Sequence, residues 1–183
     1  MMASAAPKPG IDHVVAAVPS SGRGFTGAVL TEVARCLQGE GYRLAGVVQT
    51  GLERIAEGPC DTVLTVLPAG TRVDITQDLG PHATGCRLDQ QALEDAVGLV
   101  DPSLDDRAQL LVINKFGKRE AEGAGFRQTI ARAVERGIPV VLGIGPKERE
   151  ALEAYIGDGL AILPDDEAAI LSWCRAHMGM PQG

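Results

Sequence analysis

The sequence has few aromatic residues, no block of basic residues and no long apolar run, and each shortage excludes a class of protein. Aromatic residues make up 3% of the 183 residues, and the formal net charge is −7. Nucleic-acid binding requires a basic surface and is helped by aromatic side chains on which bases stack. No apolar run reaches the roughly 18–20 residues that a membrane span requires. We therefore expect neither nucleic acid nor membrane as a partner.

The N-terminal residues have few charged side chains and no long apolar run. Residues 1–10 carry Lys8 as their one charged side chain and have no apolar core of a signal peptide, which predicts a flexible tail and a cytoplasmic protein. The length fits one domain, expected at residues 11–178, with a second short tail at 179–183. In a cytoplasmic protein the four cysteines are expected to be reduced.

Short β-branched runs alternate with helical patterns along most of the chain. The expected strands are 13–18, 43–49, 109–113, 138–143 and 160–163. The expected helices are 28–37, 89–100, 126–136, 147–156 and 164–177. Such alternation predicts right-handed βαβ crossovers and a three-layer α/β fold with a mainly parallel sheet.

One module departs from this alternation. Residues 62–67 and 71–76 are both strand-like, and Pro68–Gly70 between them has the chemistry of a tight turn. This pattern predicts an inserted β-hairpin, in a module of about residues 60–88.

A loop close to a phosphate-binding loop follows the first expected strand. Setting the pattern G-x-x-x-x-G-K-[ST] on Pro19–Thr26 matches Gly24 and Thr26, but Pro19 replaces the first glycine and Phe25 replaces the lysine. The missing lysine removes a positive charge from the phosphate site, and phosphoryl transfer depends on such charges. The sequence thus predicts an altered anion cradle with weak hydrolysis, and a small-residue turn that only packs helix on strand is the alternative.

The candidate ligand-binding residues follow from this alignment and from the end of a later strand. They are Ser20, Ser21, Gly22, Arg23, Gly24, Phe25, Thr26, Gly27 and Asn114.

The chain resembles the small nucleoside-triphosphatase family, whose members carry G-x4-GKT and later D-E-I-G-x-M-E-L. Asn114–Ala121 parallels the second motif: Gly117 and Glu120 match, whereas Asn114 replaces its Asp and Lys115 its Glu. The resemblance implies a P-loop NTPase-like fold that holds a nucleotide, ATP or GTP, with Mg²⁺. The two replacements remove the groups that organise Mg²⁺ and polarise the attacking water.

The chain more closely resembles an uncharacterised bacterial domain family, some of whose members are associated with molybdate transport genes. The segments that carry this resemblance are Gln77–Gly80, Gly85–Asp89 and Asn114–Gly123. The family has no established activity, so the resemblance implies kinship and leaves the function open.

Three residues are candidates for catalysis. Lys115 stands where the related family has its glutamate, and Glu120 and Glu122 are expected in a loop after the strand, near the sheet edge where ligands bind in open α/β folds. Either carboxylate is a candidate general base. The alternative is a pair of solvated carboxylates that balance neighbouring cations.

Cys60 and Cys86 flank the expected hairpin and form a candidate site for a soft metal or a redox pair. Their spacing fits no compact zinc pattern, and two small buried residues are the alternative.

Four hypotheses remain open. The first is a nucleotide- or phosphate-binding accessory protein with weak or absent hydrolysis. The others are an NTPase that uses Arg23 and Lys115, a metal- or oxyanion-handling protein that uses Cys60 and Cys86, and a scaffold that has lost its ligand. A protein partner or a homodimer is compatible with all four.

Overall fold

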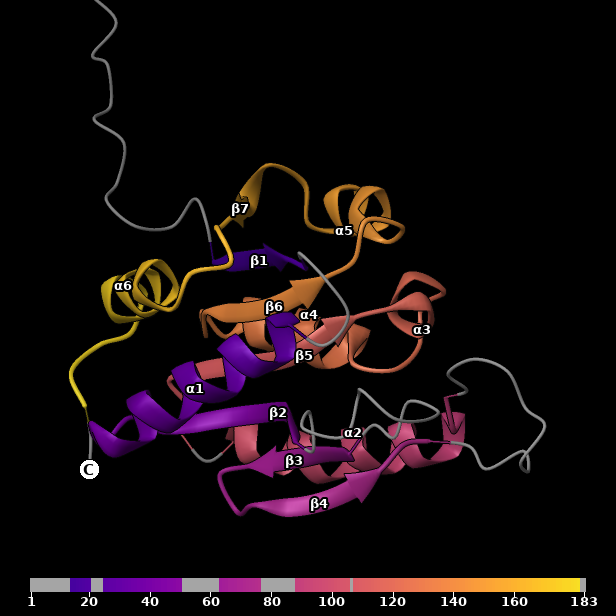
Figure 1. The fold of residues 1–183 in the computed structure, drawn as a ribbon, viewed down its shortest axis with the longest axis horizontal. Coiled ribbons are helices and arrows are strands. Elements are labelled where there is room, and N and C mark those ends of the chain that lie inside the picture. Colours follow the sequence, from indigo (N-terminus) through magenta and orange to yellow (C-terminus); the bar gives the residue numbers. More distant parts are fainter. Residues whose placement is uncertain (1–13, 21–24, 51–62, 77–87, 106, 182–183) are drawn as a thin grey trace, which may run out of the picture.

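The computed structural model describes residues 14–20, 25–50, 63–76, 88–105 and 107–181, with the backbone alone at Phe25, Thr26 and Thr50. In these residues the chain forms a seven-stranded sheet in the order β4-β3-β2-β5-β6-β1-β7, covered by helices on both faces (Figure 1). The predicted three-layer α/β fold is confirmed.

Five strands are mutually parallel and form the centre and one edge of the sheet. They are β1 (Val15–Pro19), β2 (Leu44–Thr50), β5 (Leu110–Phe116), β6 (Val140–Ile144) and β7 (Leu160–Ile162). Their Val-, Leu- and Ile-rich runs suit strands that are buried on both faces. Because the strands are parallel, their carboxyl ends all lie along the same end of the sheet.

The predicted hairpin is confirmed as β3 (Val63–Leu67) and β4 (Thr71–Asp74). β3 pairs antiparallel with β2 and with β4, so the hairpin extends the sheet at its other edge. β4 ends two residues earlier than expected. The Asp74 carboxylate accepts a hydrogen bond of 2.9 Å from the backbone N–H of Thr76, and this local turn ends the strand.

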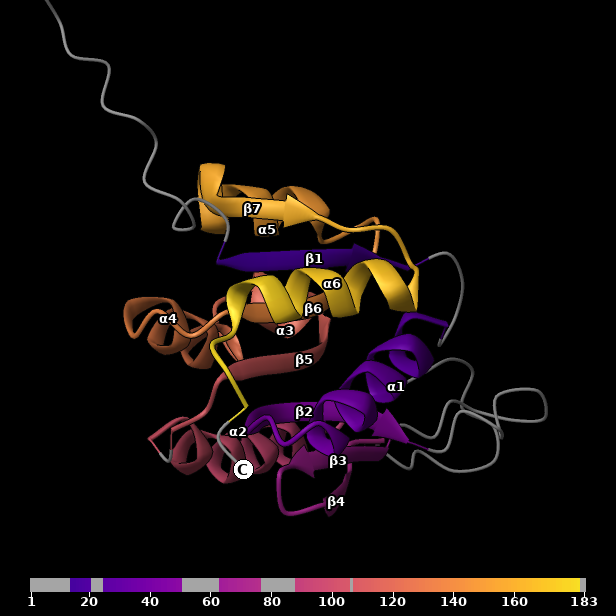
Figure 2. The ribbon, with the colours of Figure 1, turned by 90° about the vertical axis from the view of Figure 1, so that its left-hand side faces the viewer.

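The helices divide between the two faces of the sheet (Figure 2). One face carries α1 (Phe25–Gly39) and α6 (Glu167–His177), and the other carries α2 (Gln90–Asp105), α4 (Arg127–Glu135) and α5 (Arg149–Ile156). Side chains alternate between the two cores along each strand: Val15 lies in the core under α4, and Ala16 lies in the core under α1.

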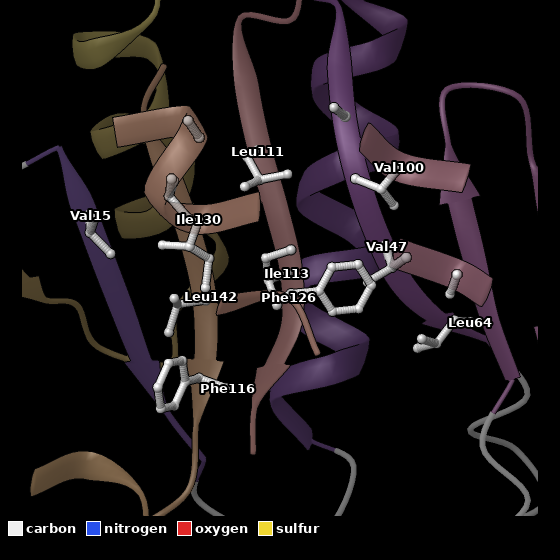
Figure 3. Packing of buried hydrophobic residues seen from close by; sticks show 14 of the residues in the cluster. Val15, Val47, Leu64, Val100, Leu111, Ile113, Phe116, Phe126, Ile130 and Leu142 are labelled. Atoms are coloured by element: carbon white, nitrogen blue, oxygen red, sulfur yellow. The ribbon is translucent and has the colours of Figure 1, made fainter. Parts of the chain in front are cut away.

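The core under α2 and α4 is built from aliphatic side chains and two phenylalanines, Phe116 and Phe126 (Figure 3). Each fully buried side chain of this kind contributes about 1.5–3 kcal/mol relative to an exposed one. Two dense cores of this size fix the ends of the strands, which is what positions the groups described below.

Helix ends follow the capping residues. Asp89 precedes α2 and accepts a 3.0 Å hydrogen bond from the N–H of Ala92, and Asp166 accepts one of 2.9 Å from the N–H of Ala169 at the start of α6. α2 continues past its expected end near Val100 and through Pro102 to Asp105. Leu104, which is buried against the sheet, anchors this additional turn.

Candidate functional site

The carboxyl ends of the parallel strands bring together residues that are far apart in the sequence. The N–H of Ser20, just after β1, donates a 2.9 Å hydrogen bond to the carbonyl of Ile144 at the end of β6. α1 leaves β1 over one face of the sheet, and α5 follows β6 on the opposite face. Ligands of open α/β folds bind at such a switch point.

The strand and helix that flank the predicted phosphate loop are in place. Pro19 is the last residue of β1, and α1 begins at Phe25, three residues before the start expected from periodicity. Phe25, Thr26 and Gly27 therefore form the first helical turn. The loop's remaining candidates, Ser21, Gly22, Arg23 and Gly24, lie outside the described residues, and so do the side chains of Phe25 and Thr26. The cradle itself stays a prediction.

Gly27 is the point at which α1 contacts the ends of two strands. A Cβ atom at Gly27 would lie 2.9 Å from Oε1 of Gln49 and 3.1 Å from Oδ1 of Asn114. The first turn of α1 thus approaches β2 and β5 closely because residue 27 has no side chain. Oγ1 of Thr31 lies 2.8 Å from the carbonyl oxygen of Gly27 and 2.8 Å from that of Gln49. The Thr31 hydroxyl thus lies between α1 and β2, within hydrogen-bond distance of both.

The amides of Gln49 and Asn114 form a pair beside this turn. Nδ2 of Asn114 donates to Oε1 of Gln49 over 3.3 Å. Oδ1 of Asn114 is buried and has no hydrogen-bond partner among the described residues. Leaving such an acceptor without a donor costs about 1–3 kcal/mol. The site therefore contains a buried acceptor that another group can satisfy.

Lys115 follows Asn114 in β5, and its exposed side chain extends toward the loop after β6. A Cβ atom at Gly145 would lie 3.8 Å from Cε of Lys115 and 3.1 Å from Oε2 of Glu148. A cation and a carboxylate thus flank the Gly145 backbone. Within the described residues Lys115 forms no ion pair.

The expectation of a loop carboxylate is wrong for Glu120. A short helix, α3 (Lys118–Ala121), follows β5 directly, and Glu120 in it is only 3% exposed. Its Oε2 accepts a hydrogen bond of 3.0 Å from the N–H of Gly117, and its Oε1 accepts one of 3.3 Å from the N–H of Phe126. Burial raises the pKa of this carboxyl above its usual range, although the two amide donors oppose the shift.

Glu122 differs from Glu120 in burial and in its partners. It is exposed at the end of α3, and its carboxylate lies 3.9 Å from both Nζ of Lys118 and Nη1 of Arg119. Exposed pairs at this distance contribute little to stability. Glu122 is therefore a solvated carboxylate that balances neighbouring cations, the alternative that the sequence left open.

The predicted metal ligands Cys60 and Cys86 lie outside the described residues, so the metal site stays a prediction. In the part of the chain that the structure describes, no three His, Cys, Asp or Glu side chains cluster closely enough to hold an ion. Cys174 is buried in α6, and burial raises the pKa of its thiol to about 12, which keeps it protonated and unreactive.

A shallow depression lies beside the start of the predicted loop. It is mostly apolar and is lined by Pro19, Ser20, Ile162, Leu163, Pro164 and Asp165. Ile162 at the end of the edge strand β7 is 41% exposed. The carboxyl ends of the strands thus carry an apolar surface near β1 and β7 and polar groups near β2 and β5.

Sequence reasoning identified Asn114, Lys115 and Gly27 but missed Gln49, Thr31 and Glu148. Gln49 and Thr31 are identified by contacts between distant segments, and Glu148 by its approach to the Gly145 backbone. Nothing in their local sequence indicates these contacts.

Among the helices of the described residues, none has the length and apolarity that crossing a bilayer requires.

Comparison with known proteins supports the fold. The family described as "Protein of unknown function (DUF2478)" matches residues 15–173. The structure is similar to that of THEP1 from Aquifex aeolicus, with a TM-score of 0.64 and 14% identity over 90% of this chain and 98% of that one. It is also similar to a human cancer-related nucleoside triphosphatase, with a TM-score of 0.56 and 18% identity over 82% and 86% of the two chains. At these identities the likeness shows the P-loop NTPase-like fold alone.

A sequence relative extends the comparison. The chain is 33% identical over 147 residues to the molybdenum import ATP-binding protein ModC 2 of Bradyrhizobium diazoefficiens. The match covers 80% of this chain but only 16% of that protein. The name therefore describes a protein of which most lies outside the match.

Proposed function

Because the chain belongs to the DUF2478 family of proteins of unknown function, we propose its role from its own site: a nucleotide- or phosphate-binding accessory protein with weak or absent hydrolysis. One observation carries the proposal. The first turn of α1 packs at Gly27 against Gln49 and Asn114, and Lys115, which follows Asn114 in β5, forms no ion pair with the other described residues.

The start of α1 supplies the attraction for an anion. The first N–H groups of a helix have no acceptor within the helix, and the helix dipole places partial positive charge there. Such donors bind phosphate even in an acidic protein. Lys115 adds a full charge at the neighbouring strand end.

Weak hydrolysis follows from the groups that the strand end lacks. The similar nucleoside-triphosphatase family has Asp and Glu where this chain has Asn114 and Lys115, and Lys where it has Phe25. Neither replacement at the strand end supplies a carboxylate that could orient or deprotonate the attacking water. Glu120, a carboxylate close in sequence, has its oxygens occupied by backbone amides. Removing one charge-stabilising group lowers such rates by about 100–1,000-fold.

The apolar depression suits the rest of a nucleotide. It is lined in part by Ser20, which lies in the predicted loop, and Ile162 and Pro164 contribute apolar surface there. A purine ring buried against such surface would add affinity that inorganic phosphate cannot gain.

Thermal unfolding with ATP, GTP, ADP and inorganic phosphate tests the proposal. A ligand at about 100 times its Kd adds roughly 2.7 kcal/mol of apparent stability. We expect Lys115→Ala to reduce this shift. Lys118→Ala is the matched control, because Lys118 is an exposed lysine of α3 that pairs with Glu122. No shift with any of the four ligands at millimolar concentration contradicts the proposal.

An oxyanion is the second candidate ligand, and the molybdenum import protein among the relatives favours it. Molybdate in the same assay separates the two: a shift with molybdate and none with nucleotides replaces the first proposal. Metal analysis before and after Cys60→Ser and Cys86→Ser tests the metal hypothesis. Phosphate release that is lost in Arg23→Ala would support an active NTPase instead.

A further inference from the structure

The apolar depression lies where β1 and β7 end side by side (Figure 2). We propose that it takes the base of the bound nucleotide and selects guanine over adenine, with the carboxylate of Asp165 accepting hydrogen bonds from the N1–H and amino groups of guanine. The inference rests on the proposed function and names the base that the same site prefers.

The size of the depression suits a base and not a whole nucleotide. Its volume of about 380 Å³ lies near the lower end of the roughly 300–1,000 Å³ that small-ligand sites occupy. Its walls are held by the sheet. The N–H of Ser20 donates to the carbonyl of Ile144, and the N–H of Leu163 donates to the carbonyl of Ala17, each over 2.9 Å. The surface that a ring would pack against is therefore formed before any ligand binds.

The lining offers few hydrogen-bond donors. Pro19 and Pro164 have no backbone N–H, and the N–H groups of Ser20 and Leu163 are already bonded to neighbouring strands. The hydroxyl of Ser20 can donate, but it accepts equally well. A base edge that must accept a hydrogen bond thus finds little to pair with here, whereas an edge that only donates is favoured.

Asp165 supplies the acceptor for such an edge. Of the six described residues that line the depression, it alone carries a charge. A carboxylate has about four acceptor sites, so Asp165 can accept from a base in addition to its other contacts. Guanine presents N1–H and its amino group side by side and can donate to both oxygens. Adenine presents its amino group beside the lone pair of N1, which a carboxylate oxygen repels.

The turn between β7 and α6 holds Asp165 in place. Its neighbour Asp166 is committed to the helix, because Oδ2 accepts a 2.9 Å hydrogen bond from the N–H of Ala169 and its own N–H donates to the carbonyl of Pro164 over 2.8 Å. The negative charge of Asp165 also repels phosphate groups. This favours a nucleotide that places its base in the depression and its phosphates at the start of α1.

Calorimetric titration of the full chain with GTP, ATP and inosine triphosphate tests the inference. The three ligands share ribose and triphosphate, so a difference between their Kd values reports the base alone. We expect GTP to bind at least about tenfold more tightly than ATP. Inosine triphosphate, which keeps N1–H but lacks the amino group, should bind between them. Equal Kd values for GTP and ATP, or tighter binding of ATP, overturn the inference and leave the proposed function standing. No binding of any of the three overturns the proposed function, and the inference with it.

Two variants assign the preference to its residue. Asp165→Asn replaces an accepting oxygen by a donor, and an asparagine amide can pair with adenine through one donor and one acceptor. We expect this variant to weaken GTP binding by about tenfold and to abolish the preference over ATP. Asp166→Asn is the matched control: it removes the same charge one residue away and keeps a good helix cap, so the ratio of the two Kd values should stay unchanged.

A ratio that Asp165→Asn leaves unchanged, or that Asp166→Asn abolishes equally, overturns the inference. Unfolding of each unliganded variant shows whether it folds. Should Asp165→Asn fail to fold, inosine triphosphate decides, because binding as tight as that of GTP would show that the amino group of guanine is not read.

Discussion

Asn114 and Glu120 lie six residues apart around the end of β5, and both place polar atoms out of contact with water. The carboxylate of Glu120 receives two backbone hydrogen bonds, whereas Oδ1 of Asn114 receives none among the described residues. Buried polar atoms in native proteins nearly always have partners. A satisfied buried group stabilises the fold, and an unsatisfied one weakens it unless something binds there. The comparison therefore predicts a structural role for Glu120 and a ligand-binding role for Asn114 within a single segment.

The largest effect is expected at Glu120. Glu120→Ala leaves the N–H groups of Gly117 and Phe126 buried without acceptors. Each unsatisfied donor costs about 1–3 kcal/mol, so we expect the free energy of unfolding to fall by roughly 3 kcal/mol. Denaturant unfolding measures it. A loss below about 1 kcal/mol would mean that Glu120 does not organise the segment after β5.

The raised pKa of Glu120 adds a dependence on pH. Because the folded-state pKa lies above the unfolded one, the folded state binds more protons between the two values. Its contribution to stability is complete below the unfolded pKa, near 4.5, and is lost as the pH rises through the folded pKa. Glu120→Gln cannot titrate, so unfolding curves at several pH values should lose this step. A step that persists in the variant shows that Glu120 is not its source.

The next effect concerns the apolar end of the site. Ile162→Glu places a charge in the depression beside Ser20. We expect ATP binding to weaken by about tenfold, or 1.4 kcal/mol, and binding of inorganic phosphate to stay unchanged. Val134→Glu is the control. Val134 is about as exposed as Ile162, and it lies near the end of α4, which leads to the start of β6 and not to the carboxyl ends of the strands. Equal losses for ATP and phosphate would place the nucleotide elsewhere.

The sequence predicted the elements well because their signals are local. The valine- and leucine-rich runs and the hairpin turn each act within a few residues. It did not predict α3, since four residues carry no helical period. Glu120 was expected near solvent because Lys118, Arg119 and Glu122 surround it in sequence, and its burial depends on the amide of Phe126 in the following segment.

The site could be predicted only in part, because some of its residues are marked by local sequence and others only by contacts between distant segments. Asn114 and Lys115 stand out against a known motif, and Gly27 follows the altered phosphate loop. Gln49 ends an ordinary strand, and its role arises from contacts across 65 residues with Asn114. Lys115 and Glu148 both lie near the Gly145 backbone because β5 and β6 are neighbours in the sheet. Such groups become visible once the strand order is known.

Replacing two helical glycines by alanine is expected to change the stability by less than the changes above, and differently at the two positions. A Cβ atom at Gly98 in α2 meets no atom within 4 Å, so Gly98→Ala should stabilise the protein by about 0.5–1 kcal/mol through helix propensity. At Gly27 the same change pushes the Gln49 and Asn114 amides aside and should cancel that gain. Thermal unfolding of both variants measures the difference. If Gly27→Ala stabilises the protein as much as Gly98→Ala, the amides adapt freely and the close approach of α1 is not a constraint.

The smallest effect on stability is expected at Asn114, and it is the most informative. Asn114→Ala removes one weak hydrogen bond to Gln49, worth about 1 kcal/mol, and also removes a buried acceptor whose burial costs about as much. We expect the free energy of unfolding of the unliganded protein to change by less than about 1 kcal/mol. Binding of a ligand that donates a hydrogen bond to Oδ1, such as a hydroxyl or amino group of ATP, should weaken, because the variant lacks an acceptor that no described residue satisfies. A large loss of stability with unchanged binding would show that Asn114 is, like Glu120, a structural residue.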